Sequence, residues 1–186
     1  MTSPSFGSQL VVEIPYLRAF AISLSGSYSV ADDLVQDTLM KAWSHSDSFQ
    51  QGTNLRAWLV TILRNTYFSQ FRKRAREVQD TDGFYSEQIP VKGEQESKLQ
   101  MNDVQRALDK LAPEHREILL MIGVTELSYE EAAQILEVAV GTVKSRLNRA
   151  RAKLAEHLGL NDTAEIGADP LVSGIAAKTG TTPGAI

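Results

Sequence analysis

One stretch of the chain, SYEEAAQILEVAVGTVKSRLNRARAKL, limits the possible folds more than any other. It runs from Ser128 to Leu154 and contains two helical patterns, separated at EVAVG by a turn of about three or four residues. Ser128 and Glu131 have the spacing of a capping box, which predicts where the first helix begins. All the acids lie in the first half of the stretch and all the strong bases in the second. A short helix, a tight turn and a longer basic helix together predict a helix-turn-helix.

The second helix of this stretch, beginning near Val140, has two different faces. A stripe of apolar residues at spacings of four, three and four predicts the face that packs on the core: Val143, Leu147, Ala150 and Leu154. The opposite face carries small and hydrogen-bonding residues: Gly141, Ser145, Asn148, Arg149 and Ala152. Bases flank that face: Lys144, Arg146, Arg151 and Lys153. This arrangement favours DNA recognition in the major groove, and the alternative is a solvated basic helix on a small bundle.

The rest of the chain also shows helical periods, and alternating strand patterns are absent. We expect a helix that opens at Pro15 and stops at Gly26, and a second from Ser29 to about Trp43 with Trp43 among its apolar positions. Asn54 can cap a long helix that runs through Arg76. Further helices are expected from near Glu96 to Pro113, and from His115 to about Gly123. The predicted fold class is therefore all-α.

The segment 77–97 separates two sets of helices, because its first part is rich in Asp, Gln and Gly and has no apolar period. We predict two small helical domains with separate cores, at 8–76 and 98–160, joined by a flexible linker. Residues 161–186 are rich in Gly, Ala and Thr, which predicts a disordered tail. A short docking peptide around 170–175 is the alternative for that tail.

A second basic cluster lies at the end of the first domain, although the net charge of the chain is −4. Its members are Arg64, Arg72, Lys73, Arg74 and Arg76, with no acid among them. The aromatic residues Tyr67, Phe68 and Phe71 are interleaved with these bases. Aromatic faces stack on unpaired bases while a basic rim follows the backbone, so the cluster fits single-stranded or opening DNA. Core packing of the aromatics is an equally good interpretation.

Composition excludes several other classes of protein. The chain has no cysteine, and its three histidines are far apart, so we expect neither disulfides nor a metal site. No stretch is long and apolar enough to span a membrane, and the N-terminus has no signal-peptide pattern, so we expect a cytoplasmic protein. We find no nucleophile with a base, no paired carboxylates in a cleft and no cofactor motif, which argues against an enzyme.

Four segments of the chain resemble the bacterial extracytoplasmic-function sigma factors of the sigma-70 family. They are DDLVQDTLMKAW, GTNLRAWLVTILRNTYFSQFRKRAREV, LAPEHREILLMIGVTELSYEEAAQIL and VGTVKSRLNRAR, and the match spans about residues 15–158. The second segment also resembles the branch of that family that runs the general stress response. The resemblance implies that 8–76 is sigma region 2, that 98–160 is sigma region 4, and that the chain directs transcription initiation.

The resemblance also implies contacts for individual residues. The DDLVQDTLMKAW helix would dock on the clamp helices of the largest polymerase subunit through Asp33, Gln36, Asp37 and Met40. Capture of a minus-ten base and promoter melting would involve Phe49, Arg64, Asn65, Tyr67, Arg72 and Lys73. The minus-thirty-five element would be read by Thr142, Lys144, Ser145, Arg146, Asn148, Arg149 and Lys153. Ala139, at the expected N-cap of that helix, departs from the Ser or Thr that would organise the first turn.

The expected partners are core RNA polymerase, through its clamp helices and flap, promoter DNA and a small anti-sigma protein. We expect the two domains to move freely until polymerase or a small helical inhibitor fixes them. One alternative is a helix-turn-helix regulator that acts without polymerase, which leaves the acidic helix and the aromatic basic helix without a role. The other is a sigma-like decoy that titrates an anti-sigma protein, but such decoys carry a receiver domain.

Overall fold

The computed structural model describes residues 5–79 and 97–160, with side chains described over 5–72 and 103–160. Three helices come first: α1 (Phe6–Ser25), α2 (Tyr28–Ser44) and α3 (Leu55–Gln79), with a 3-10 turn at Ser46–Ser48. Four follow: α4 (Ser97–Asp109), α5 (Pro113–Gly123), α6 (Tyr129–Leu136) and α7 (Val140–Leu158). The described part of the chain contains no strand, so the all-α prediction is confirmed. Most of the predicted linker and the whole tail 161–186 lie outside the described residues.

The first helix begins earlier than the sequence indicated. The hydroxyl of Ser5 accepts a hydrogen bond from the Ser8 amide at 3.3 Å, which caps α1 at its true start. Pro15 therefore lies inside α1 and does not open it. A proline in a helix removes one backbone hydrogen bond. Here the chain before Pro15 is nevertheless held in the helix, because Leu10 packs into the core.

Two details of α2 also differ from the prediction. Its N-cap is Ser27, whose hydroxyl faces the Val30 amide at 3.5 Å, so Ser29 already lies within the helix. Trp43 was expected among the apolar core positions, but 62% of it is exposed. It lies near the end of α2, where its indole covers Gly7 and neighbours the Phe6 ring, with the two ring centroids 6.3 Å apart.

Several predicted caps are present. The Asn54 side-chain oxygen accepts a hydrogen bond from the Ala57 amide at 3.3 Å at the start of α3. Ser128 and Glu131 form the complete capping box of α6. The Ser128 amide donates to the Glu131 carboxylate at 2.8 Å, and the Glu131 amide donates to the Ser128 hydroxyl at 3.1 Å. Ala139 is the N-cap of α7 and provides no side-chain hydrogen bond, as its methyl group requires.

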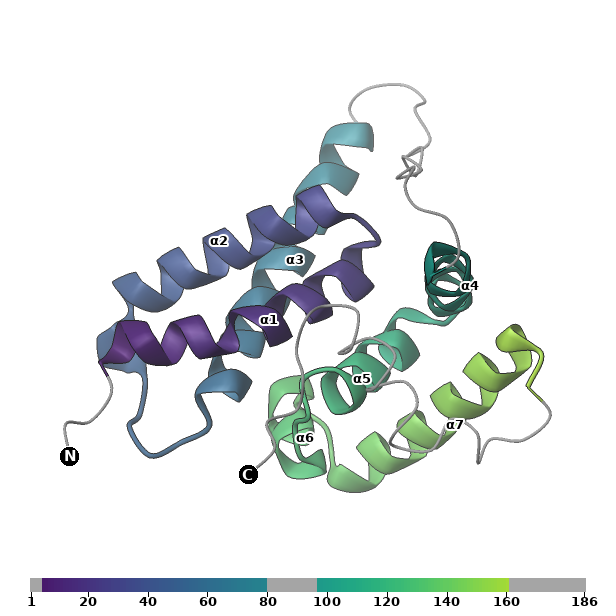
Figure 1. Ribbon diagram of the computed structural model, residues 1–186. Helices are drawn as coiled ribbons and strands as arrows, with labels where there is room; N and C mark the ends of the chain where they lie inside the picture. The colour runs from purple at the N-terminus through teal and green to yellow at the C-terminus, as the bar shows by residue number, and fades with distance from the viewer. Residues whose placement is uncertain (1–4, 80–96, 161–186) are drawn as a thin grey trace.

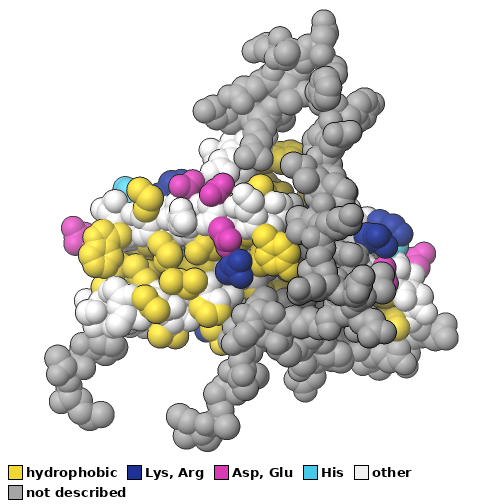
Figure 2. Space-filling view, turned by 45° about the horizontal axis from the view of Figure 1, so that its top comes forward, with side chains coloured by type: hydrophobic (Ala, Val, Ile, Leu, Met, Phe, Trp, Pro, Cys, Tyr) yellow, Lys and Arg dark blue, Asp and Glu magenta, His cyan; other side chains and the backbone are white. Residues whose placement is uncertain are grey.

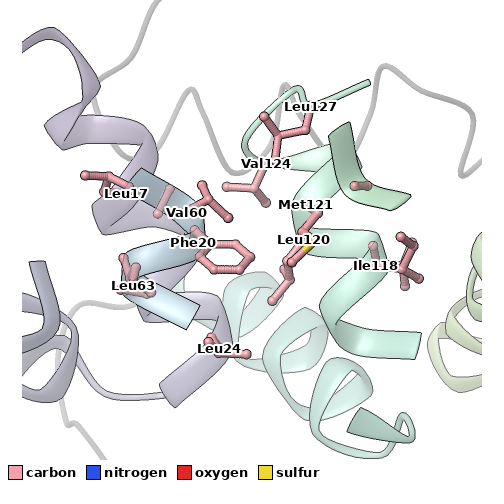
Figure 3. Packing of buried hydrophobic residues seen from close by; sticks show 14 of the residues in the cluster. Leu17, Phe20, Leu24, Val60, Leu63, Ile118, Leu120, Met121, Val124 and Leu127 are labelled. Atoms are coloured by element: carbon pink, nitrogen blue, oxygen red, sulfur yellow. The ribbon is translucent and has the colours of Figure 1, made fainter. Parts of the chain in front are cut away.

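The helices form two bundles that lie side by side (Figure 1). We call α1–α3 the N-terminal bundle and α4–α7 the C-terminal bundle. Helix α1 contacts α5, and α3 contacts α6. Phe20 of α1 and Val60 of α3 lie opposite Leu120 and Val124, which come from the end of α5 (Figure 3). The buried residues of both bundles form one continuous cluster, so the prediction of two separate cores is wrong for this structure. Each bundle has apolar side chains on the surface that faces the other bundle. Packing the two bundles together removes these side chains from water.

Candidate nucleic-acid interface

Helix α7 has the two faces that its sequence predicts. The residues Val143, Leu147, Ala150 and Leu154 are all buried. Residues on the other side of the helix are exposed: Lys144, Ser145, Asn148, Arg149, Ala152 and Lys153. Thr142, Arg146 and Arg151 are half-buried at the edges of that face. An exposed helix face with amide, hydroxyl and guanidinium groups at its centre can reach base edges in a major groove.

The start of α7 is organised without a side-chain cap. The Ser145 hydroxyl donates to the Thr142 carbonyl at 3.0 Å, and the Lys144 ammonium lies 5.9 Å from the centroid of the Tyr129 ring on α6. Glu137, in the turn between α6 and α7, has φ 55°, which is in the left-handed region that favours glycine. The contact between Lys144 and Tyr129 helps to fix α7 relative to α6.

The four predicted docking residues share the outer side of α2. Asp33, Gln36 and Met40 are exposed, and 69% of Met40 is accessible to solvent. Asp37 is half-buried, because its carboxylate accepts a hydrogen bond from the Gln70 amide of α3 at 3.1 Å. The opposite side of α2 packs in the core through Leu34, Val35, Thr38 and Ala42. The structure therefore gathers these residues on one accessible, acidic helix face.

An apolar groove adjoins that face. It has a volume of about 460 Å³ and is lined by Gly7, Leu10, Val11, Ile14, Leu39, Met40, Trp43 and Ser44 of α1 and α2. Figure 2 shows the hydrophobic side chains as a band over these two helices, with acidic side chains along its edge. Exposed apolar patches rimmed by polar residues are typical of protein, membrane or ligand interaction sites. Of the residues that line this groove, only Met40 was predicted from the sequence to be functional.

The predicted minus-ten residues do not form one exposed cluster. Asn65 and Arg72 are exposed on α3, whereas the side chain of Lys73 lies outside the described residues. Phe49 belongs to an aromatic cluster, with its ring centroid 5.3 Å from that of Trp58. Tyr67 is half-buried, and its hydroxyl donates to the Leu24 carbonyl at 3.3 Å. Among the interleaved aromatic residues, Phe71 is exposed for 60% of its surface, so this ring is available for stacking.

Arg64 is engaged by the C-terminal bundle. Its Nε donates to the Glu117 carboxylate of α5 at 2.5 Å, and the guanidinium carbon lies 5.2 Å from the Phe68 ring centroid. Only 5% of Glu117 is exposed. In this structure Arg64 therefore contacts an internal carboxylate at the position where the sequence predicted a DNA contact.

Arg56 is a second residue that joins the two bundles, and the sequence did not predict this role. Its guanidinium donates to Glu13 of α1 at 2.6 Å, and to the Thr125 carbonyl and Glu126 carboxylate after α5, each at 3.1 Å. It also stacks on the Tyr16 ring at 3.4 Å. Burial acts to lower the pKa of Arg56, but Glu13, Tyr16 and Glu126 outweigh it and raise the pKa further above its usual range. A lone arginine in the apolar segment LRAWLV was the signal available for this role.

The Glu131 carboxylate of α6 also takes part in the contact between the two bundles. The Asn54 amide at the start of α3 donates to it at 2.6 Å. Partial burial acts to raise the pKa of Glu131, but hydrogen bonds from Ser128 and Asn54 outweigh it, so the pKa lies below its ordinary value. Glu131 therefore serves both the cap of α6 and the contact between the bundles.

The described residues contain no group of histidines and carboxylates that could hold a metal ion. Within the same part of the chain, no helix is long and apolar enough to cross a membrane.

Comparison with known families assigns both bundles. Residues 11–77 match the family Sigma-70 region 2, and residues 101–154 match Sigma-70, region 4. The chain is 47% identical to the ECF RNA polymerase sigma factor EcfG of Rhodopseudomonas palustris, over 95% of this chain and 97% of that protein. The chain belongs to the extracytoplasmic-function sigma factors of the sigma-70 family. Members of this family are transcription initiation factors and not enzymes, as the sequence predicted.

Solved structures are similar to this sigma factor over most of its length. The sigma factor RpoE of Bartonella quintana, solved in complex with the anti-sigma factor NepR, is 50% identical, with a TM-score of 0.78 over 84% of this chain and 98% of that one. CnrH of Cupriavidus metallidurans, solved with the cytosolic domain of CnrY, is 28% identical, with a TM-score of 0.63 over 84% of this chain and 89% of that one. The family and the two-part helical architecture are therefore confirmed.

Proposed function

We propose that this sigma factor binds core RNA polymerase in the cytoplasm and directs it to the promoters of stress-response genes. The observation that carries the proposal is the exposed face of α7, where Ser145, Asn148 and Arg149 lie between flanking bases above a fully buried apolar stripe. The similarity to EcfG supports the assignment to the stress response.

The α2 face distinguishes this proposal from a regulator that acts without polymerase. A DNA-binding regulator needs no accessible face with Asp33, Asp37 and Met40 beside an apolar groove. A protein interface has this composition, with apolar anchors at its centre and charges at its rim. We assign the groove between α1 and α2 and the adjoining acids to the polymerase clamp helices.

Promoter DNA would be contacted at two places. Thr142, Lys144, Ser145, Arg146, Asn148, Arg149 and Lys153 of α7 would read and grip the minus-thirty-five element. Asn65 and Arg72 would contact the minus-ten element, and Phe71 provides a stacking surface beside them. Phe49 supports this region through the aromatic cluster, and Arg64 joins the DNA contact only after its bond to Glu117 is broken.

A small anti-sigma protein is the proposed regulator. RpoE and CnrH, which have the same architecture, were each solved with an anti-sigma protein or a partner domain. The exposed apolar side chains Val11, Met40 and Trp43 could accept the apolar face of an inhibitor helix at the polymerase site. Competition for one surface would then explain inhibition.

In vitro transcription with core polymerase on a library of promoter sequences tests the main proposal. Addition of the protein should produce transcripts from promoters that share two spaced elements, whereas core polymerase alone should not. A protein that binds the library but starts no transcript would be a regulator without polymerase docking, and this result would overturn the proposal.

A further inference from the structure

A ring at the start of α1 contacts three other segments of the N-terminal bundle. The centroid of Phe6 lies 6.3 Å from that of Trp43 on α2, 6.1 Å from that of Phe49 in the α2–α3 connection, and 6.5 Å from that of Trp58 on α3. The Phe49 and Trp58 rings are 5.3 Å apart. These four rings make up the aromatic cluster. The start of α1 therefore lies beside the α2–α3 connection (Figure 1), and Phe6 joins that connection to three helices.

The α2–α3 connection, residues 45–54, consists of two turns with Phe49 between them. The first is the 3-10 turn that follows α2. The second is a β-turn, in which the Thr53 amide donates to the Gln50 carbonyl at 3.2 Å. Gly52, at the third position of this turn, has φ 89°, close to the value that a type II turn requires. Because the Phe49 ring packs on α1 and α3, these contacts determine where the second turn lies on the bundle.

The second turn presents polar groups that can pair with an unstacked base. Gln50, Gln51 and Thr53 are exposed, and their amide and hydroxyl groups can both donate and accept hydrogen bonds. Such groups distinguish one base edge from another. Recognition of this kind requires the groups to be held within about 0.5 Å of the productive geometry. A ring that orders the connection therefore affects which base is accepted without touching the base itself.

The residues around Phe6 hold its ring in place. The Ser8 amide donates to the Ser5 hydroxyl at 3.3 Å and the Ser8 hydroxyl donates to the Ser5 carbonyl at 2.7 Å, so the first turn of α1 is closed by two hydrogen bonds. Gly7 allows α1 to approach α2 closely, since a Cβ there would lie 3.3 Å from Cζ3 of the Trp43 indole. Phe6 itself is half-buried against the core. Contacts between tilted rings add attraction to this burial, so Phe6 provides a fixed support for Phe49.

We propose that Phe6 is a positioning residue for minus-ten recognition. Its ring orders residues 45–54 through Phe49, so that the second turn is held against the captured base. The inference rests on the proposed function, which assigns Phe49 to the capture of a minus-ten base. It extends that site to the first turn of α1.

Hydrogen exchange of the full-length protein tests the ordering. Three amides of the peptide 46–53 are protected by hydrogen bonds: Ser48, Phe49 and Thr53. Phe6→Ala should speed their exchange about tenfold, whereas Phe6→Tyr keeps a ring and should match the parent protein. Val12→Ala removes apolar surface from an exposed position of α1 outside the cluster and should leave the peptide unchanged. Peptides from α5 and α7 should exchange alike in every variant, and equal exchange of 46–53 in Phe6→Ala and the parent would overturn the positioning role.

Base discrimination by the holoenzyme tests the consequence for recognition. The probes are fluorescein-labelled single strands that carry a minus-ten element recovered from the transcription library, and versions changed at one base each. At the captured base, the parent protein should show an affinity ratio of about tenfold or more. Phe6→Ala should reduce this ratio to about threefold or less, and Phe6→Tyr and Val12→Ala should retain the parent ratio. The ratio does not depend on the fraction of active protein.

The two measurements separate the possible failures. An unchanged ratio in Phe6→Ala would overturn the positioning role alone. A parent protein that shows no discrimination at any base would overturn the assignment of this connection to the minus-ten element, which is a failure of the proposed function. Affinity for a duplex that carries only the minus-thirty-five element should stay within about twofold in all variants, because α7 lies in the other bundle. An equal loss on that duplex would reduce the effect of Phe6→Ala to general destabilisation and overturn the positioning role.

Discussion

Single residues on α7 are expected to make two kinds of DNA contact. Arg149 lies on the exposed face with Ser145 and Asn148, whereas Lys153 is exposed one turn later beside that face. An arginine that pairs with a guanine discriminates between bases, and a lysine on a phosphate does not.

Arg149→Ala should therefore cost about 1–3 kcal/mol of binding free energy at one base position of the minus-thirty-five element. Lys153→Ala is the control and should weaken binding to all promoter variants alike. Affinities of the holoenzyme for a set of single-base promoter variants, measured at one salt concentration, would separate the two. Equal loss for Arg149→Ala on every variant would assign this side chain to a phosphate.

For single residues, the sequence predicted burial correctly where the periodicity of one helix alone determines which side chains face the core. The stripe from Val143 to Leu154 repeats at helical spacing, so its burial follows from local geometry. The pairing of Arg64 with Glu117 joins residues 53 positions apart, and no periodicity connects them. The prediction for Trp43 was wrong because the helical period places it beside the core, whereas its indole lies at the surface against Gly7 and Phe6 at the start of α1.

In helices α6 and α2, individual carboxylates are expected to determine the stability of one helix and the binding surface of the other. The start of α6 depends on Glu131, whose ionised carboxylate accepts hydrogen bonds from Ser128 and Asn54. The acidic face of α2 depends on Asp33 and Asp37, which lie on its outer side next to the apolar groove.

Glu131→Gln should lower the free energy of unfolding by about 1 kcal/mol at pH 7, since the capping box loses its charged acceptor. The folded-state pKa of Glu131 is lowered, so its stabilisation is complete above the pKa of the unfolded chain and disappears as pH falls through the folded value. In urea unfolding, the stability difference between variant and parent should shrink steadily as the pH falls below the ordinary glutamate pKa of about 4.3. Glu130→Gln, at an exposed neighbouring position, should have little effect across this pH range. A difference that persists undiminished at low pH would contradict the role of the charge.

Asp37→Lys should weaken binding to core polymerase about tenfold or more, because a positive charge replaces the carboxylate at the docking face. The variant also loses the bond from Gln70, so its circular dichroism spectrum must match that of the parent protein. Asp47→Lys makes the same charge change in the exposed 3-10 turn and serves as the control. Titration of labelled protein with core polymerase would measure both. Unchanged affinity of the Asp37 variant would remove this face from the polymerase site.

At the scale of the whole molecule, the shared core is expected to make unfolding cooperative. Both tryptophans, Trp43 and Trp58, lie in the N-terminal bundle, whereas circular dichroism reports on helices of both bundles. The two signals should give coincident denaturation curves in the parent protein. Phe20→Ala removes a fully buried ring between the bundles and should lower stability by about 3–5 kcal/mol by both probes. Curves that separate in the parent protein would indicate two independently folding units.

The continuous core also means that the peptide segment between the bundles is not what holds them together. Its covalent connection raises the effective concentration of one bundle near the other, but the specificity of pairing lies in the surfaces around Phe20, Arg56 and Arg64. A chain cut between residues 80 and 96 would therefore remain a complex of two fragments that recognise each other. The two halves of this initiation factor could therefore be produced as separate polypeptides, because their complementary surfaces are sufficient to bring them together in the correct arrangement.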